Sequence, residues 1–321
     1  MVIVASLFTA PGSAYATGGE DDPKLLQNVE AAARGYVAAK QAYDAAKARQ
    51  QELNKRLDQI ESDLLPLRIQ VSKMAAQAYE NGRFSSVTAL LSSPTPSAFL
   101  ERATMLEEIN TRDNDAIGAL ASAEDEISRD KAEIDAQVKI MAQQTTEIQS
   151  RIHAAELALS SAGGSRANPN FVDPAVKTAV PSPKTSSGNW PKQSASLDDP
   201  TSGGHITPRL AHARTEAMKA GFTWFNACWR EQSWGEHPLG RACDFATYPS
   251  GFMGPAKGEY RLYGQRLAYF FVYNADRLGI LYVIWYRMIW LPGLGWRNFT
   301  PSGGESGPSG EHTNHVHLSI I

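Results

Sequence analysis

The sequence predicts an α+β protein made of two unlike parts, an N-terminal antiparallel coiled-coil hairpin and a small C-terminal mixed α/β domain with an antiparallel sheet. Apolar residues recur every three or four positions through most of residues 24–160, which is the period of long packed helices. Residues 161–204 are rich in Ser, Pro, Gly, Ala and Lys and have no such period. From residue 205 to 321, helical patterns alternate with short β-branched and aromatic runs, as in α+β domains.

Length and charge narrow the classes of function. The 321 residues suffice for two domains. A formal net charge of -3 and an isoelectric point near 6.2 give no general attraction to nucleic acid, and Lys and Arg do not cluster beside aromatic residues. We therefore expect no nucleic-acid partner.

The first residues have the pattern of a secretory signal. An apolar run at 2–10 is followed by a small-x-small cleavage site ending at Ala16, which predicts a signal peptide of residues 1–16. The basic segment that normally begins such a signal is missing, so Met1 would lie inside a longer one. The alternative is a fragment of a buried helix that ends at Pro11. Later apolar runs fall short of the roughly 18 residues that a membrane-spanning helix needs, so we expect an exported, soluble protein.

A first long helix is expected from Leu25 onward, because one three-four series continues without a break and has a charged outer face. Pro66 lies within it and should bend it, since proline removes a backbone donor. Gln50 is the single polar member of the series, which comprises Leu25, Val29, Ala32, Tyr36, Ala39, Tyr43, Ala46, Gln50, Leu53, Leu57, Ile60, Leu64, Leu67, Val71, Met74 and Ala78.

This series stops near Gly82, and a second one begins after Pro96. Between them, residues 87–91 form a short apolar element that would cap the tip of a hairpin. Two long helices joined in this way make an antiparallel hairpin, whose simplest role is that of a rigid spacer. The second series comprises Leu106, Ile117, Leu120, Ile127, Ile134, Val138, Met141, Ile148, Ile152 and Leu159.

Residues 161–204 are expected to form a flexible linker, because their composition buries little apolar surface. The C-terminal domain, residues 205–321, follows it. Thr207 and Pro208 begin a helix that Gly221 ends. The other expected elements are strands at 222–229 and 241–247, a helix at 260–278, and strands at 280–290 and 315–320.

The two cysteines, Cys228 and Cys243, lie 15 residues apart on strands expected to be neighbours. In an exported protein we expect them to form a disulfide, worth about 3 kcal/mol for a loop of this size. The alternative is a pair of buried thiols.

The strongest chemical signal is a set of histidines and one carboxylate. His237 precedes a Pro-Leu-Gly turn and is followed seven positions later by Asp244, which can bring an imidazole and a carboxylate to one end of a strand. His315 and His317 are two positions apart and so point to the same face of a strand. These are the ligand types of catalytic zinc sites with three protein ligands and a water. Cys243 has the opposite parity from Asp244 and is not an expected ligand. The alternative is a histidine-rich strand end held by hydrogen bonds.

The motif His-x-x-Gly-x-Ala-x-Asp, with Ser233 shortly before it, and a terminal His-x-His resemble the zinc peptidases named after lysostaphin, D-Ala-D-Ala peptidases and the sonic hedgehog domain. The His-to-Asp spacing of seven is similar to that of D-Ala-D-Ala carboxypeptidases, VanX-like enzymes and MepA-like murein endopeptidases. The resemblance covers roughly residues 205–321 and rests on about ten positions. It implies a Zn²⁺ ion held by His237, Asp244 and His317.

The catalytic base is expected to differ from that of the carboxypeptidases. Those enzymes carry a Glu three residues before the last ligand, where this chain has Asn314. The endopeptidases have His-x-x-His-x-His instead, which His312, His315 and His317 reproduce, and this implies an endopeptidase with a histidine base. His315 would take a proton from water and pass it to the leaving amine. His312 or Glu311 would orient the water or the substrate.

Residues around the first ligand would complete the site. Gln232 and Ser233 would hold His237, because ligating histidines usually donate their other N–H. Arg230 would anchor a substrate carboxylate. Strand parity turns Arg241 away from the site, which makes it structural.

The hairpin carries a second resemblance. A coiled coil with Tyr-x-x-Gly and Ser-Ser-Pro near its tip, ahead of a C-terminal murein hydrolase, is similar to the peptidoglycan hydrolases PcsB, CwlO and RipC. In that class the coiled coil docks on the membrane complex FtsE-FtsX and holds the hydrolase inactive. The resemblance implies that the tip exposes Phe84, Val87, Leu90, Leu91 and Phe99 to such a complex.

Two functions from different classes follow. The first is an exported zinc peptidase that cleaves peptide crosslinks of peptidoglycan during wall remodelling or division and is regulated through its coiled coil. The second is a scaffold without catalytic activity, whose terminal domain binds cell-wall peptide and recruits another hydrolase. Both place the protein outside the cytoplasm, at the cell wall.

Overall fold

The computed structural model describes residues 23–82, 85–299 and 307–321. The expected signal peptide and Phe84 lie outside these residues. The chain divides into two compact units, Tyr43–Gln143 and a unit in which the described residues up to Ala42 join Gln144–Ile321. The described residues before Tyr43 and the helical residues from Gln144 to Ser161 therefore belong to the same unit as the C-terminal sheet. We call these two helical segments the bases of the long helices.

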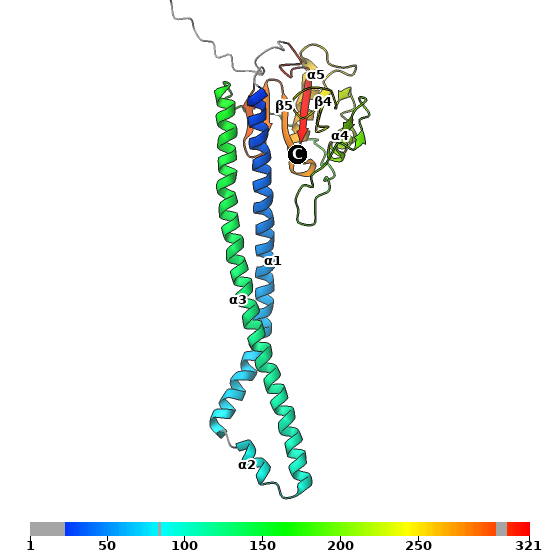
Figure 1. Ribbon diagram of the computed structural model, residues 1–321. Helices are drawn as coiled ribbons and strands as arrows, with labels where there is room; N and C mark the ends of the chain where they lie inside the picture. The colour runs from blue at the N-terminus through cyan, green and yellow to red at the C-terminus, as the bar shows by residue number, and fades with distance from the viewer. Residues whose placement is uncertain (1–22, 83–84, 300–306) are drawn as a thin grey trace, which may run out of the picture. The chain divides into compact units, whose positions relative to one another are not determined.

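The two long helices are present and confirm the hairpin (Figure 1). They are α1 (Pro23–Asn81) and α3 (Pro96–Ser161), with the short α2 (Ser85–Leu91) between them. Helix α1 continues through Pro66 without ending. The expected series of α1 supplies its buried positions, among them Val29, Ala32, Ala39, Ala46, Leu53, Leu57 and Leu64.

Within the unit Tyr43–Gln143, ion pairs between α1 and α3 show that the helices are antiparallel. Arg49 pairs with Glu133 at 2.6 Å, and Arg68 pairs with Glu124 at 3.4 Å. The residue number rises along α1 as it falls along α3, which is the register of a hairpin.

The expected series of α3 is correct only in part. All members of the series were expected to pack against the other helix. Leu120 and Ile127 are partly buried, but Ile117 and Val138 are 49% and 44% exposed. The neighbour of Ile117, Ala116, is buried instead. One residue of offset on a helix turns a side chain by about 100°, so an apolar residue beside the seam reaches solvent.

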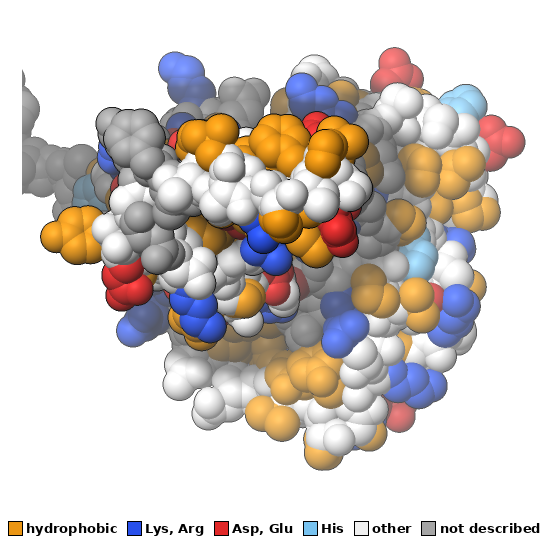
Figure 2. Space-filling view, turned by 90° about the horizontal axis from the view of Figure 1, so that it is seen from below, with side chains coloured by type: hydrophobic (Ala, Val, Ile, Leu, Met, Phe, Trp, Pro, Cys, Tyr) orange, Lys and Arg blue, Asp and Glu red, His pale blue; other side chains and the backbone are white. Residues whose placement is uncertain are grey.

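Apolar side chains are exposed near the hairpin tip. Val87, Leu91 and Phe99 are 49%, 78% and 41% exposed, and Leu90 is partly buried. Figure 2 views the molecule from this end and shows hydrophobic side chains interspersed with charged ones. Among the described residues, no helix is both long and apolar enough to cross a membrane.

The C-terminal part contains a six-stranded antiparallel sheet with the order β3-β4-β8-β5-β6-β7. The strands are β3 (Asn226–Ala227), β4 (Ala242–Ala246), β5 (Ile280–Trp285), β6 (Met288–Leu291), β7 (Gly295–Asn298) and β8 (His315–Ile320). A separate two-stranded sheet pairs β1 (Leu197–Asp198) with β2 (His205–Ile206). The helices are α4 (Pro208–Ala220), α5 (Gly258–Tyr273) and α6 (Ala275–Leu278).

Helix α4 has the ends that the sequence predicts. The side chain of Thr207 accepts a hydrogen bond from the backbone N–H of Leu210 at 3.3 Å, as an N-cap does. Gly221 ends the helix with φ 111°, a left-handed conformation that favours glycine.

The expected strand at 280–290 is instead a hairpin of β5 and β6. Its two-residue turn consists of Tyr286 and Arg287, with φ of 51° and 61°. This conformation is that of a type I′ turn, which normally carries Asn or Gly, so the residue types Tyr and Arg do not indicate a turn here. The expected strand at 222–229 is shortened to β3.

The segment expected to be a flexible linker is attached to the C-terminal sheet domain. Ala179 and Ser182 are 4% and 3% exposed. The amide of Asn274 accepts from Ala179 N at 2.8 Å and donates to the carbonyl of Lys177 at 3.0 Å. Asn274 also separates α5 from α6, which breaks the helix expected at 260–278. Hydrogen bonds to the backbone of this segment attach it to the domain, and amino-acid composition does not indicate such bonds.

The sheet is covered differently on its two faces. One face packs through Phe245, Val283 and Val316 against α4 and α5 and forms the main core. Part of the other face packs through Ile284 and Ile289 against the bases of α1 and α3. The rest of this second face carries the polar residues described next.

Candidate metal centre

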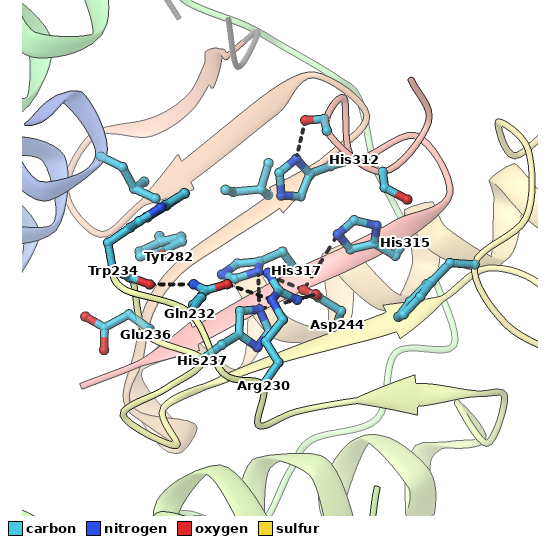
Figure 3. Close-up of a pocket in the computed structure, with 16 residues that line it drawn as sticks. Arg230, Gln232, Trp234, Glu236, His237, Asp244, Tyr282, His312, His315 and His317 are labelled. Atoms are coloured by element: carbon cyan, nitrogen blue, oxygen red, sulfur yellow. Dashed lines mark hydrogen bonds and ion pairs between the residues drawn. The ribbon is translucent and has the colours of Figure 1, made fainter. Parts of the chain in front are cut away.

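Strand pairing brings the two predicted motifs together. In the antiparallel pair of β4 and β8, Asp244 lies directly opposite His317, and Ala246 lies opposite His315. His237 approaches from the loop between β3 and β4. The turn after it is closed by Gly240, which has φ 65° and donates its N–H to the carbonyl of His237 at 3.0 Å. Figure 3 shows these side chains converging in one pocket.

The three expected ligands form a compact buried cluster. His237, Asp244 and His317 are 1%, 3% and 6% exposed, and their ligand atoms all lie within 4.8 Å of one another. His317 Nδ1 is 2.8 Å from one carboxylate oxygen of Asp244, and His237 Nε2 is 3.2 Å from the other. The two ring nitrogens are 3.3 Å apart. The predicted convergence of the two motifs is confirmed.

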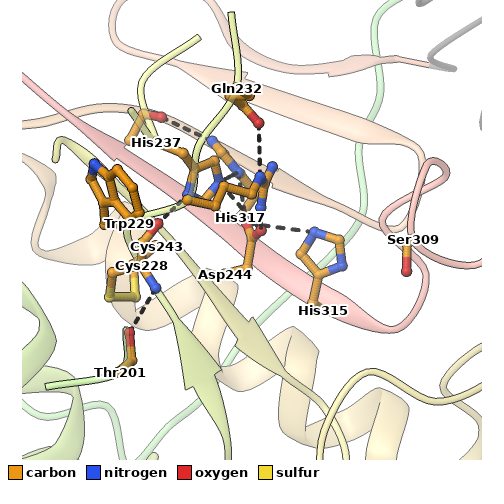
Figure 4. Close-up of polar contacts among 12 residues, drawn as sticks. Thr201, Cys228, Trp229, Gln232, His237, Cys243, Asp244, Ser309, His315 and His317 are labelled. Carbon is orange, nitrogen blue, oxygen red and sulfur yellow. Dashed lines mark hydrogen bonds and ion pairs between the residues drawn. A yellow bond between two sulfur atoms is a disulfide. The ribbon is translucent and has the colours of Figure 1, made fainter. Parts of the chain in front are cut away.

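The outward ring nitrogens also have partners. His237 Nδ1 donates to the backbone carbonyl of Cys228, and His317 Nε2 lies 2.9 Å from the hydroxyl of Ser319 (Figure 4). Ligating histidines commonly have such a hydrogen bond, because it fixes the tautomer whose other nitrogen has a free lone pair. Two oriented imidazoles and one carboxylate therefore fit a divalent metal ion.

The charge of Asp244 is compensated by its surroundings. Burial by itself would raise the pKa of Asp244, but the surrounding imidazoles, His237 foremost, hold this pKa well below its usual range. The guanidinium of Arg230 contacts the same carboxylate. Asp244 is thus ionised and available as a ligand.

His315 lies beside the cluster and is held in one orientation. Its Nδ1 is 2.8 Å from the amide oxygen of Asn314, and its Nε2 is 3.6 Å from Asp244. Since the amide oxygen can only accept, Nδ1 carries the proton and Nε2 has the free lone pair. Burial lowers the pKa of His315 to about 4, so the ring is neutral at neutral pH. Asn314, at the position of the carboxypeptidase Glu, orients this histidine.

His312 also belongs to the cluster. Its ring centroid lies 4.8 Å from that of His315, and its Nδ1 is 3.0 Å from the carbonyl of Gly310. Burial, followed by the neighbouring imidazoles, holds the pKa of His312 well below its usual value. Its φ of 49° shows that the loop before β8 bends sharply to place this ring.

Some expected site residues lie elsewhere. Glu311 pairs with Arg287 at 2.6 Å and does not line the pocket. Ser233 does not line it either, and the carbonyl of Cys228 holds His237 in the role expected of Ser233 and Gln232. Gln232 does line the pocket.

The two arginines have different surroundings. Gln232 accepts from Arg230 Nε at 2.8 Å, so it orients Arg230 and not His237. Arg230 faces the pocket and its side chain is 50% exposed. Arg241 does not line the pocket and pairs at 2.5 Å with Glu236, which also pairs with Arg34 of α1.

The pocket contains residues that the sequence analysis missed. Tyr282 stacks on His317 with ring centroids 5.4 Å apart and an interplanar angle of 11°. Ser319 shares the face of His317, so the same two-residue alternation could have identified it. The pocket has a volume of about 430 Å³ and is lined by Leu26, Arg230, Gln232, Trp234, Gly235, Glu236, His237, Asp244, Phe252, Tyr282, Ile284, Ser309, Gly310, His312, His315 and His317.

The disulfide between Cys228 and Cys243 is confirmed and lies directly beside the cluster. Cys228 provides the carbonyl that holds His237, and Cys243 precedes Asp244 in β4. The bond therefore links the backbone on two sides of the site. A disulfide of this kind indicates an oxidising, extracytoplasmic environment.

Comparison with known proteins gives one match. A family model described as VldE, C-terminal domain, matches residues 202–315. This region includes His237, Asp244 and His315 and ends two residues before His317. No curated protein and no solved structure gives a significant match. The match includes two of the three expected ligands but specifies neither a peptidase nor a metal.

Proposed function

We propose that this protein is an exported zinc-dependent endopeptidase that cleaves peptide crosslinks of peptidoglycan. The observation that carries the proposal is the convergence of His237, Asp244 and His317 in one pocket, with a fourth buried side chain, His315, oriented beside them. The motif resemblance supplies the substrate class, and the disulfide supports an extracytoplasmic site of action.

The donor set favours zinc among divalent metals. Two imidazole nitrogens and a carboxylate are the ligands of catalytic zinc sites, whereas calcium and magnesium prefer oxygen ligands only. When bound, zinc lowers the pKa of a coordinated water to about 7 and polarises a carbonyl group. His237 Nε2, His317 Nδ1 and the carboxylate of Asp244 would hold the ion.

His315 is the proposed general base. Its Nε2 has a free lone pair because Asn314 accepts from Nδ1. Burial keeps the ring neutral, so Nε2 can accept a proton from water and return it to the amine of the leaving peptide. His312, which is neutral and lies beside His315, would orient the water or the substrate.

Arg230 is the proposed anchor for the substrate. It lies on the pocket wall with half of its side chain exposed, and Gln232 holds its Nε at 2.8 Å. A guanidinium can bind a carboxylate through two parallel hydrogen bonds. Peptidoglycan stem peptides are rich in carboxylates, which fits this arrangement.

The hairpin would connect the enzyme to its regulator. Within the unit Tyr43–Gln143, the exposed side chains Val87, Leu91 and Phe99 lie near the tip. An FtsE-FtsX-type membrane complex would dock on these side chains. Two arguments support this docking: the resemblance of the hairpin to the PcsB, CwlO and RipC class, and the exposure of the apolar side chains.

The deciding experiment uses the full mature chain, produced in an oxidising compartment. Metal content is measured by mass spectrometry, and purified sacculi are digested with and without a chelator. We expect one zinc per chain and soluble muropeptides whose masses identify the cleaved crosslink, with digestion lost in chelator and restored by zinc. One zinc per chain without any digestion would refute the enzyme and favour a wall-binding scaffold.

A further inference from the structure

The first helix contributes a buried acid next to the candidate metal centre. Glu30 of α1 is 9% exposed, and its Oε1 accepts a hydrogen bond from the hydroxyl of Tyr282 at 2.8 Å. Tyr282 is 1% exposed and stacks on the ligand His317. Glu30 and the sheet belong to the same compact unit.

A second hydroxyl completes the connection to the ligand. Ser319 is fully buried and lies directly opposite Tyr282 in the pairing of β5 and β8. Its hydroxyl lies 2.9 Å from His317 Nε2, and the strand register places the side chains of Ser319 and Tyr282 next to each other on one face of the sheet. Ser319 and Tyr282 are therefore neighbouring hydroxyls between His317 and Glu30, the first bonded to His317 and the second to Glu30.

With Glu30 ionised and a metal ion on Nδ1 of His317, hydrogen bonds along this connection have one direction. An ionised carboxylate only accepts, so the hydroxyl of Tyr282 must donate to Glu30. The oxygen of Tyr282 then accepts from Ser319, and the oxygen of Ser319 accepts from Nε2–H of His317. In this tautomer the lone pair is on Nδ1, the nitrogen that would bind the ion between Asp244 and His237, whereas without a metal Nδ1 would donate to the carboxylate of Asp244.

We infer that Glu30 is a positioning residue of the metal centre, which acts through Tyr282 and Ser319 to hold His317 in its ligating tautomer. The inference rests on the metal site of the proposed function and deepens it. Carboxylates commonly orient ligating histidines by accepting from the outer ring nitrogen, and here two hydroxyls extend that arrangement to another helix.

A second contact of α1 supports the same conclusion. Arg34, one turn after Glu30, donates to Glu236 at 2.5 Å. Glu236 is 3% exposed and precedes the ligand His237. Helix α1 thus contacts the residue that precedes one ligating histidine and the tyrosine that stacks on the other.

The test measures zinc affinity of the full chain by competition with a chromophoric chelator. Removing an outer partner of a ligand typically lowers metal affinity about 10–100-fold. We expect Glu30→Ala to lower the zinc affinity about tenfold, the lower end of that range, because the hydroxyls of Tyr282 and Ser319 lie between Glu30 and His317. Glu30→Gln keeps an accepting oxygen and should lose less. Asn28→Ala, on the exposed side of α1, is the matched control.

Tyr282→Phe provides an independent variant, since it keeps the stacked ring but removes the hydroxyl that donates to Glu30 and lies next to Ser319. A loss of zinc affinity in Tyr282→Phe of about tenfold would support the inference. This variant alone provides the test if Glu30→Ala does not fold. The absorption spectrum of the cobalt-substituted protein should change in both variants, which a purely structural role of α1 does not require. Wild-type affinity in a folded Glu30→Ala or Tyr282→Phe would overturn the inference.

Different results would refute the endopeptidase activity and the role of Glu30. A wild-type chain that binds zinc but leaves sacculi intact would remove the endopeptidase and leave the role of Glu30 standing. A wild-type chain that digests sacculi, together with a Glu30→Ala variant of unchanged zinc affinity, would remove only the role of Glu30.

Discussion

The two faces of strand β8 differ completely although they are built from alternate residues of one six-residue segment. Val316, Leu318 and Ile320 are fully buried in the main core against the helices. His315, His317 and Ser319 point to the other face and carry the candidate chemistry. The comparison shows how a fold places reactive groups, because the apolar face fixes the strand and the polar face inherits that fixed position.

The largest effect is expected on the polar face from His317→Ala, which removes one of three ligands. Zinc affinity should fall by more than the roughly 10–100-fold typical of outer partners, and digestion of sacculi should stop. The measurement is zinc content after dialysis against a weak chelator. Val316→Ala, the adjacent residue on the opposite face, should retain zinc in its folded fraction. Equal loss in both variants would contradict the division between the faces.

His315→Ala tests the residue that shares the face of His317 without being a ligand. We expect kcat for muropeptide cleavage to fall about 10²–10⁴-fold, as for loss of a general base, while one zinc per chain is retained. Steady-state kinetics and metal analysis of the same sample are the measurement. His153→Ala, at an exposed histidine of α3, is the control and should keep wild-type kinetics. Unchanged turnover in His315→Ala would exclude its proposed role.

Leu318→Ala tests the apolar face. Truncating a fully buried leucine should lower the free energy of unfolding by about 2–5 kcal/mol, through lost burial and the cavity that remains. Denaturant unfolding of the metal-free protein measures this. Zinc stoichiometry of the folded fraction should stay the same, so an unchanged stability with lost zinc would reverse the assignment of the two faces.

The disulfide joins the strand next to β8 to the loop that holds His237. Replacing Cys228 and Cys243 together by Ala should lower the free energy of unfolding by about 3 kcal/mol, since the bridge closes a loop of 15 residues. Denaturant unfolding of the double variant and of the reduced wild type should agree. A double variant as stable as the oxidised protein would show that the bridge contributes nothing to the fold.

Local periodicity revealed much of this architecture. The three-four spacing predicted α1 and α3, and the Thr207 and Gly221 signals predicted both ends of α4. The two-residue alternation placed His315 and His317 on one face of their strand. These features depend on neighbours in the chain, so a single segment of sequence is enough to recognise them.

Other features depended on contacts between distant segments. The turn at Tyr286 and Arg287 uses residues that rarely adopt its conformation, and residues near Ala179 are attached by distant side chains such as Asn274 and Glu216. No local pattern marks either feature.

The sequence by itself determined which residues are able to bind a metal and which of them share a strand face. Only the tertiary structure decided that Asp244 pairs with His317, that Asn314 orients His315, and that Glu30 lies next to Tyr282. The physical reason is that a hydrogen bond acts over about 3 Å and requires a fixed direction. Glu30 and Tyr282 are separated by 252 positions in the chain, so only packing of α1 on the sheet brings them together.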